Sequence, residues 1–342
     1  MNSHSTSAKP FLAVVLLNAL LAFPVLYLVY KHFNPAFTPW DINSYMTMVS
    51  QGPGSLEPPF RYRFLIPMLV RAMRFLPGYS IPVVFSAEPS VRNDFFHFAV
   101  LNFLMTILTS GLLFLYLRDR LRPAFAYLGS LLYLFSFFSV LANFIPMTDA
   151  GCHLAIIVCI LLMEKKRPFG FMVACLVGVF VKETLLVVLP LWILIQSFAH
   201  GPHRRRLLYL AYTAPAVLAY FMATRLYPAQ SSVPYYNPSF LMQNVLGAFC
   251  PDSYGRSFLF HLLLLHLPLM VSFLIFLYLK VSGAGKDLKI NPELFLFFFL
   301  IGMGVVMGIG NNADRLAFMA FPAVVYFEAM TLQAVAQRLE LG

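Results

Sequence analysis

The sequence predicts an all-α, polytopic membrane protein, and three observations carry that prediction: its composition, its hydropathy and the form of its apolar runs. Of the 342 residues, 60% are apolar and only 11% are charged, whereas about a quarter of the residues of a soluble domain are charged. The mean hydropathy is +0.77. The run over 258–279 is apolar on every face, which favours helices over the alternating strands of a β-barrel. We therefore expect a single transmembrane domain over 1–342, with no separate soluble domain.

Apolar runs of roughly 20 residues cross a hydrocarbon core, and the breaks between such runs divide this chain into about ten spans. The first span is interpreted as retained, because its apolar stretch is longer than the core of a signal peptide. Two large outer loops remain, 31–94, which holds an interfacial helix, and 225–257. The predicted spans are 11–30, 95–117, 124–145, 149–163, 169–181, 184–199, 207–224, 258–279, 294–311 and 316–336.

The basic residues lie in short clusters between the predicted spans. Lys and Arg exceed Asp and Glu by 24 to 14. Because cytoplasmic loops are enriched in Lys and Arg, the clusters at 118–122, 164–167, 203–206 and 280–289 predict that both termini are cytoplasmic. Topology explains the excess charge, so no nucleic-acid partner is expected. The four cysteines include no CxxC pair, and neither a disulfide framework nor a zinc site is expected.

The basic clusters also predict two helical hairpins whose outer tips lie within the depth of the membrane. A single helix over 169–199 would put the clusters at its two ends on opposite sides, whereas a hairpin keeps both inside. Its arms, of about 13 and 16 residues, reach about 20–24 Å, less than a core about 30 Å thick. The preceding hairpin breaks at 145–151. We expect a cavity that opens outward beneath the two large loops, with Asp149, Lys182 and Glu183 near its floor.

Charged residues at membrane depth are costly and usually functional, which makes Lys182 and Glu183 candidates for binding or catalysis. The alternative is an ion pair that only locks the hairpin. Asp41 follows the first span closely and is a candidate catalytic carboxylate. It also suits the N-cap of a helix over 42–51. Tyr45, in the same segment, is a candidate for contact with a sugar or acceptor.

A basic and aromatic stretch in the first outer loop contains Arg61 and Arg63, and leads into an amphipathic segment with Arg71 and Arg74. Such a segment suits the membrane interface. A guanidinium fork binds phosphate oxygens well. The arginines are therefore candidates for a phosphate site, and contact with lipid headgroups is the alternative.

Two further sites lie later in the chain. Asp314 and Arg315 belong to a polar break before the last span, which is either functional or an ordinary solvated turn. Tyr235 and Tyr236, in the second outer loop, either stack on a sugar ring or lie at the interface. The chain contains no HExxH, GxGxxG or GxxxxGK[ST] motif, so these patterns predict neither a metal site nor a nucleotide cradle.

The order of these motifs resembles the GT-C superfamily of integral-membrane glycosyltransferases. The resemblance rests on an aspartate in the first outer loop, the PFRYR stretch at 59–63, an aspartate that opens the fourth span, a Lys-Glu hairpin tip and an acidic-Arg break before the last span. It is best over residues 11–200. It implies a polyprenyl-phosphate-linked sugar donor, a lipid or glycan acceptor, and an active site on the outer face of the membrane. The compactness of the chain favours a bacterial or archaeal plasma membrane, and thus synthesis of a cell-envelope polysaccharide.

Residue by residue, the resemblance implies that Asp41 is the general base toward the acceptor and that Asp149 helps to organise the donor site. Lys182 and Glu183 would face that site from the next hairpin. The candidates for the lipid phosphate are Arg61, Arg63 and Arg315. The candidates for acceptor or sugar contact are Tyr45, Tyr235, Tyr236 and Asp314.

The chain departs from many members of the superfamily in two respects. Asp149 is followed by Ala150 and Gly151 instead of a second carboxylate, so a divalent metal is possible but is not implied. No C-terminal soluble domain is expected. Because such a domain would support transfer to a protein, a protein acceptor is not implied.

Other classes of membrane protein remain open from the sequence. A secondary transporter or a flippase of lipid-linked substrates would place Lys182 and Glu183 in its pathway. No equivalent of their context occurs in the second half of the chain, which speaks against the two matched halves of many transporters. A polysaccharide polymerase, an acyltransferase and a non-catalytic scaffold are further alternatives.

Overall fold

The computed structural model describes residues 8–32, 40–56, 60–77, 89–136, 139–140, 143–199, 204–226, 266–283, 285, 287–306 and 316–341. All regular secondary structure in the described residues is helical, with no strand, which confirms the all-α prediction. They form two compact units. Unit 1 comprises Met1–Leu161 and Phe180–Lys182, and unit 2 comprises Leu162–Val179 and Glu183–Gly342.

Each of the ten predicted apolar segments overlaps a helix of the structure. These helices are α1 (Ala8–His32), α4 (Pro89–Arg118), α5 (Pro123–Leu134), α7 (Asp149–Glu164), α8 (Pro168–Val179), α9 (Leu185–Ala199), α10 (Arg204–Leu226), α13 (Leu267–Val281), α14 (Leu294–Val306) and α16 (Phe321–Leu341). Within the described residues, four stretches are long and apolar enough to cross a bilayer: Lys9–Val29, Asn93–Arg118, Arg206–Leu226 and Phe318–Glu340. The structure therefore contains membrane-length helices, as predicted, but it does not establish ten spans.

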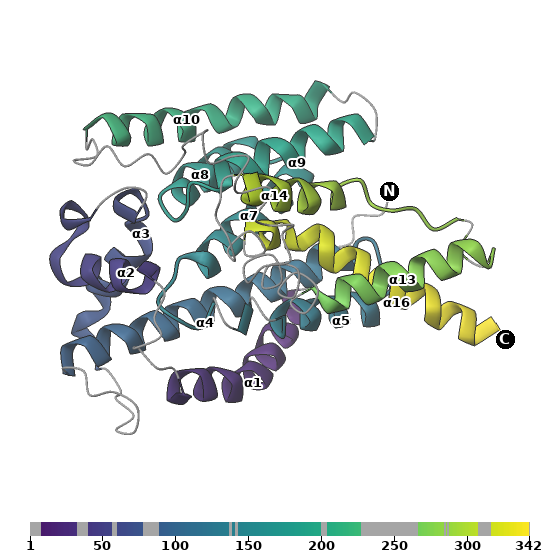
Figure 1. The fold of residues 1–342 in the computed structure, drawn as a ribbon, viewed down its shortest axis with the longest axis horizontal. Helices are drawn as coiled ribbons and strands as arrows, with labels where there is room; N and C mark the ends of the chain where they lie inside the picture. The colour runs from purple at the N-terminus through teal and green to yellow at the C-terminus, as the bar shows by residue number, and fades with distance from the viewer. Residues whose placement is uncertain are drawn as a thin grey trace, which may run out of the picture. The chain divides into compact units, whose positions relative to one another are not determined.

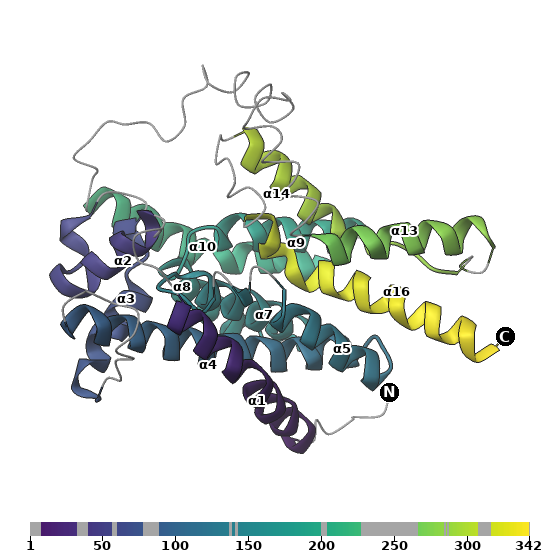
Figure 2. The same cartoon turned by 60° about the horizontal axis from the view of Figure 1, so that its bottom comes forward.

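In unit 1, helix α4 lies between α1 and α5, and Figures 1 and 2 both draw α1 against α4. A buried polar chain joins the three helices. The Asn18 amide of α1 donates to Ser110 Oγ of α4 at 2.8 Å, and Ser110 Oγ donates to the Ser130 carbonyl of α5 at 2.9 Å. Such hydrogen bonds between helices stabilise their packing in a lipid environment, where apolar contact alone gives little preference.

Gly111 allows α1 to approach α4 closely. A Cβ atom added at this position would lie 2.6 Å from Val15 Cγ2 and 3.0 Å from Phe11 Cε2. Small residues at helix–helix interfaces are typical of membrane proteins, because they let the backbones come together. The packing of α1 therefore depends on the absence of a side chain at this point of α4.

The segment that the sequence predicts to be the first outer loop contains two short helices, α2 (Trp40–Gln51) and α3 (Leu65–Ala72), and short 3-10 turns. Helix α3 is amphipathic, as predicted: Ile66 and Val70 are buried, whereas Leu69 and Arg71 are exposed. The 3-10 turn η4 (Met73–Phe75) follows it directly.

An ion pair ties this part of the loop to α4. Arg74 of η4 donates two hydrogen bonds to the Asp94 carboxylate, at 2.8 and 2.6 Å. The hydrogen bonding of Arg74 to the Asp94 carboxylate raises the pKa of the Arg74 guanidinium. The bidentate geometry fixes η4 against the first described turns of α4.

Helix α5 ends at Leu134, well before the predicted end of its span at residue 145. Serine hydroxyls at this end bond the local backbone, because Ser136 Oγ donates to the Tyr133 carbonyl and accepts from the Ser139 N–H. Such bonds compete with continued helix formation. Residues 143–148 then lead without regular structure into α7.

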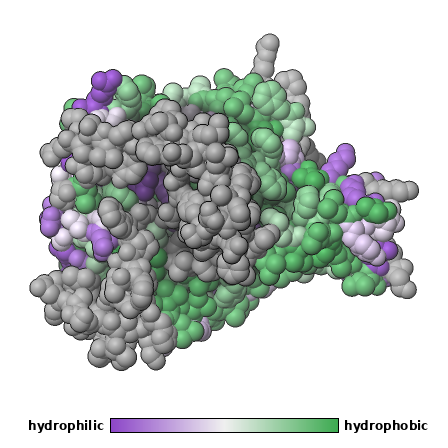
Figure 3. Space-filling view, in the orientation of Figure 1, coloured by the Kyte–Doolittle hydropathy of each residue, from purple (hydrophilic) through white to green (hydrophobic). Residues whose placement is uncertain are grey.

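In unit 2, α8 and α9 pack with α10, and α13 packs with α16. Figures 1 and 2 show α13 and α16 running in the same direction. The Phe327 ring of α16 lies 5.5 Å from the Phe276 ring of α13. The opposite face of α13 exposes apolar side chains such as Leu274, and hydrophobic side chains cover the region of α13 in Figure 3. This distribution suits contact with lipid.

The close approach at Gly111 predicts that Gly111→Ala lowers the thermal stability of the purified protein. Gly302→Ala in α14 is the matched control, because a Cβ atom there meets nothing within 4 Å. Both changes raise helix propensity, so the difference between them isolates the clash, which we expect to cost about 1–3 kcal/mol. Thermal melts in the same lipid or detergent measure it. Equal shifts in the two variants would refute the close packing of α1 on α4.

Candidate functional site

A buried ion pair connects the start of α7 to the segment between α8 and α9. Lys182 Nζ donates to Asp149 Oδ1 at 2.7 Å, and the two side chains are only 8% and 1% exposed. Asp149 is the first residue of α7, where the helix dipole favours a negative charge. Both residues lie in unit 1. The structure thus brings together two of the three residues that the sequence predicts near the floor of one cavity, Asp149 and Lys182.

Gly151 makes room for the segment that carries Lys182. A Cβ atom added to Gly151 would lie 2.9 Å from Val181 Cγ1 and 3.0 Å from Ile66 Cδ1. The same segment is held by α3, because the Leu65 N–H donates to the Phe180 carbonyl at 3.2 Å. The first turn of α7 and the start of α3 therefore fix the position of Lys182 next to Asp149.

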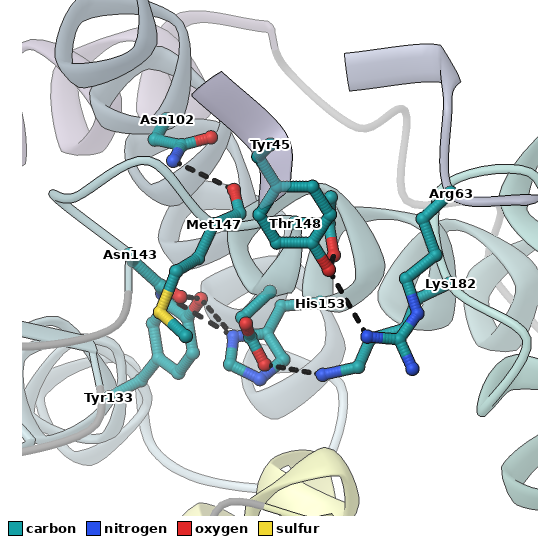
Figure 4. A network of polar contacts seen from close by, with 10 residues as sticks. Tyr45, Arg63, Asn102, Tyr133, Asn143, Met147, Thr148, His153 and Lys182 are labelled. Carbon is teal, nitrogen blue, oxygen red and sulfur yellow. Dashed lines mark hydrogen bonds and ion pairs between the residues drawn. The ribbon is translucent and has the colours of Figure 1, made fainter. Parts of the chain in front are cut away.

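A second cation enters the same cluster through Tyr45. Arg63 Nη1 donates to the Tyr45 hydroxyl at 3.1 Å, and this hydroxyl lies 3.2 Å from Thr148 Oγ1. Tyr45 is fully buried and Arg63 is 9% exposed. Because Thr148 directly precedes Asp149, the contacts form one continuous chain from Arg63 to Lys182 (Figure 4).

Asn102 of α4 holds the irregular segment that leads into α7. Its amide Nδ2 donates to the carbonyls of Ile145 and Met147, at 2.6 and 3.0 Å. Buried carbonyls outside a helix need such partners. Asn102 therefore fixes the path of the chain just before Thr148 and Asp149.

A second group of polar side chains lies one turn further along α7. The Tyr133 hydroxyl is 3.1 Å from His153 Nδ1, and Asn143 Nδ2 donates to the Tyr133 hydroxyl at 3.1 Å. His153 follows Asp149 by four residues, so the two lie on one face of α7. Within the described residues, the amide oxygens of Asn102 and Asn143 are buried without a hydrogen-bond partner. Buried acceptors of this kind are suited to water or to a hydroxyl group of a ligand.

The other predicted residues have different positions. Arg61 donates from Nε and Nη2 to the carbonyls of Leu56 and Gly54, and so holds the loop together. Glu183 begins the turn into α9, where its carbonyl accepts from the Leu186 N–H.

The remaining predictions fall partly or wholly outside the described residues. Asp41 is the second residue of α2, one helical turn before Tyr45, so it lies within the helix instead of capping it. The Asp41 side chain is outside the described part of the structure. Tyr235, Tyr236, Asp314 and Arg315 lie entirely outside the described residues.

Sequence reasoning missed five buried members of the site: Asn102, Tyr133, Asn143, Thr148 and His153. For all of them except Thr148, the available signal was a polar side chain within a predicted apolar span. Their partners come from distant parts of the chain, and no local spacing reveals such contacts.

The arrangement combines two buried cations, Arg63 and Lys182, with the Asp149 carboxylate. Preorganised cations of this type stabilise the oxygens of a phosphate, and a paired carboxylate keeps a lysine ammonium in place. The described residues contain no group of three or more His, Cys, Asp or Glu side chains suited to a metal ion. No protein-family model, no curated protein and no solved structure gives a significant match to this chain.

The buried ion pair predicts strong coupling between Asp149 and Lys182. Asp149→Asn or Lys182→Met alone leaves one buried charge uncompensated, and we expect each to lower stability by about 3–5 kcal/mol. The double variant should lose much less than the sum. The Arg74 and Asp94 pair, whose arginine is 39% exposed, is the internal comparison and should show a coupling of about 1 kcal/mol or less. Denaturation of the single and double variants of each pair, in one lipid mixture, measures the two coupling free energies. Additive losses for Asp149 and Lys182 would contradict the pairing.

The position of Gly151 yields a second prediction. Gly151→Ala should lower the unfolding temperature, because its methyl group meets Val181 and Ile66. Val181→Ala removes the first obstacle, so adding it to Gly151→Ala should recover part of the loss, by roughly 1 kcal/mol. Thermal melts of the two single variants and the double variant provide the test. Simple additivity would mean that Gly151 does not hold the Lys182 segment in place.

Proposed function

We propose that the protein is a membrane glycosyltransferase that moves a sugar from a polyprenyl-phosphate carrier to a lipid or glycan acceptor on the outer face of the membrane. The observation that carries this proposal is the buried chain of contacts from Arg63 through Tyr45 and Thr148 to Asp149 and Lys182. Four separate segments supply it, within a chain that is 60% apolar. Buried charge of this kind in a membrane protein usually marks a functional site.

The two cations are suited to the phosphate of the donor. When the bond between sugar and phosphate breaks, positive charge develops at the anomeric carbon and negative charge on the leaving phosphate. Arg63 and Lys182 would stabilise that negative charge without reorganisation, because both are already held by hydrogen bonds. Asp149 would act as a positioning residue that keeps the Lys182 ammonium in place.

Asp41 is the proposed general base toward the acceptor hydroxyl. It precedes Tyr45 by one turn of α2, and the Tyr45 hydroxyl belongs to the cluster. A carboxylate that removes the acceptor proton as the new glycosidic bond forms contributes typically about 10²–10⁴-fold to the rate. Glu183, Tyr235, Tyr236, Asp314 and Arg315 remain proposed contributors to donor or acceptor contact.

Transport of a lipid-linked substrate is the second candidate function. The Lys182 segment lies between α8 and α9, which have only 12 and 15 residues. Short, interrupted helices that bring a charged pair to membrane depth are typical of transporter pathways. A flippase would move the intact lipid-linked sugar across the bilayer, whereas a glycosyltransferase would break the bond between sugar and phosphate.

Transfer from a panel of radiolabelled polyprenyl-phosphate sugars by the protein in proteoliposomes tests the proposal. We expect the wild type to release free polyprenyl phosphate and a glycosylated product. Asp41→Asn should reduce turnover by about 10²-fold or more with little effect on donor binding. Arg63→Lys should instead weaken donor binding, because lysine cannot reproduce the guanidinium fork.

Arg120→Lys is the matched control for Arg63→Lys, since Arg120 lies at the exposed end of α4 and donates to the Tyr116 carbonyl. Thermal melts confirm that each variant is folded. Movement of the intact lipid-linked sugar across the bilayer without bond cleavage would favour the flippase. No consumption of any donor, with Asp41→Asn indistinguishable from wild type, would refute the glycosyltransferase.

A further inference from the structure

A buried carboxylic acid in α16 plays no part in the site described above. Glu328 is 6% exposed and is the only charged residue between Leu316 and Gln337. In the membrane-length stretch Phe318–Glu340, ten residues precede it and twelve follow it. At about 1.5 Å per residue, Glu328 therefore lies about 15 and 18 Å from the two ends. That position is the middle of a hydrocarbon core about 30 Å thick.

Thr331, a buried polar residue one turn further along α16, donates its hydroxyl to the Phe327 carbonyl, and no second charged residue lies beside Glu328 on this part of the helix. The neighbouring Phe327 is fully buried and packs against Phe273 and Phe276 of α13. Helix α14, which also packs on α16, contributes only apolar residues and glycines. Within the described residues, the Glu328 side chain makes no hydrogen bond and no ion pair.

Few titratable groups belong to the elements that pack against α16. On α13, the Lys280 ammonium lies over the Phe276 ring at 5.8 Å from its centroid, and the helix also carries Tyr278. The Asn291 amide donates to the Ala323 carbonyl near the start of α16, so the nearby Glu293 belongs to that end. The 3-10 turn η7 (Phe318–Ala320) carries no titratable group. The others are His266 before α13, Tyr326 two residues before Glu328, and Arg338 and Glu340 at the far end of α16.

A carboxylate at this depth needs a positive partner, because an isolated charge in hydrocarbon is strongly disfavoured. A divalent cation requires six or more oxygen ligands, and the described residues offer no group of three potential metal ligands. A proton needs only one carboxylate oxygen. Glu328 also retains a small exposed fraction, whereas Phe327 and Ala329 on either side have none.

We propose that Glu328 is a proton-binding site in the middle of the membrane, distinct from the sugar-transfer site and independent of it. One carboxylate oxygen takes a proton from water to form a neutral acid, and returns that proton to water when the pH rises. The site belongs to unit 2, whereas the Asp149 and Lys182 pair belongs to unit 1.

Labelling with N,N′-dicyclohexylcarbodiimide tests this proposal. The reagent partitions into the apolar core and reacts with carboxyl groups in the protonated form. The full-length protein in lipid nanodiscs is labelled over pH 6–9, digested, and analysed by mass spectrometry for the peptides that contain Glu328, Glu293 and Glu340. We expect Glu328 to be labelled at pH 6 and the labelling to fall as the pH is raised, approaching about tenfold per pH unit once the carboxylate predominates.

Glu340 is the matched control, because it lies on the same helix but is exposed, and it should be labelled at least about tenfold less than Glu328 at pH 6. Glu328→Gln, which keeps the shape of the protonated acid, should fold normally by thermal melt and lose the label. Absence of label on a recovered Glu328 peptide would overturn the proposal. Label that does not change over pH 6–9 would also overturn it, because the proton would then not exchange. The experiment uses no sugar donor, so its failure is distinguishable from failure of the glycosyltransferase.

Discussion

The hydrogen-bonded ion pair between Lys182 and Asp149 is the constraint on which the architecture of unit 1 depends. A charge in an apolar chain is tolerated only where a partner of opposite charge is held within hydrogen-bond distance. Gly151 and the backbone bond between Leu65 and Phe180 bring the lysine segment to that distance. On the other side, Asn102 holds the irregular segment before α7, so that the aspartate begins its helix at the required place.

This constraint also explains why so many separate segments converge on the start of α7. The segment between α1 and α4 contributes Tyr45 and Arg63, and α4 contributes Asn102. The segment after α8 contributes Lys182. A purely structural lock would need only two charges. The additional cation and the other polar groups add fixed donors and buried acceptors, which the phosphate and hydroxyl groups of the proposed substrates would use.

Composition and apolar run length predicted the helices well, because a chain in hydrocarbon must satisfy its backbone hydrogen bonds internally. Each predicted span therefore overlaps a helix, although only four stretches within the described residues reach membrane length. The early end of α5 was not predicted, since it depends on what Ser136 and Ser139 bond locally. The link between Tyr45 and Thr148 joins residues 103 positions apart, and no periodicity encodes such a contact. The roles assigned to Asp41 and Arg315 remain predictions.

Glu328 and Asp149 illustrate two solutions to the same electrostatic problem. Asp149 lies at a helix start, where backbone N–H groups and a lysine are available, and it can remain ionised because both stabilise its charge. Glu328 lies in the middle of a helix, where every nearby backbone N–H is already bonded within the helix. The nearby hydroxyl of Thr331 is already bonded to the Phe327 carbonyl, so we propose that the partner of the Glu328 carboxylate is a proton. The position of a carboxylate within its helix thus determines its role. It serves either as a fixed charge that orients a lysine or as a site that binds and releases a proton.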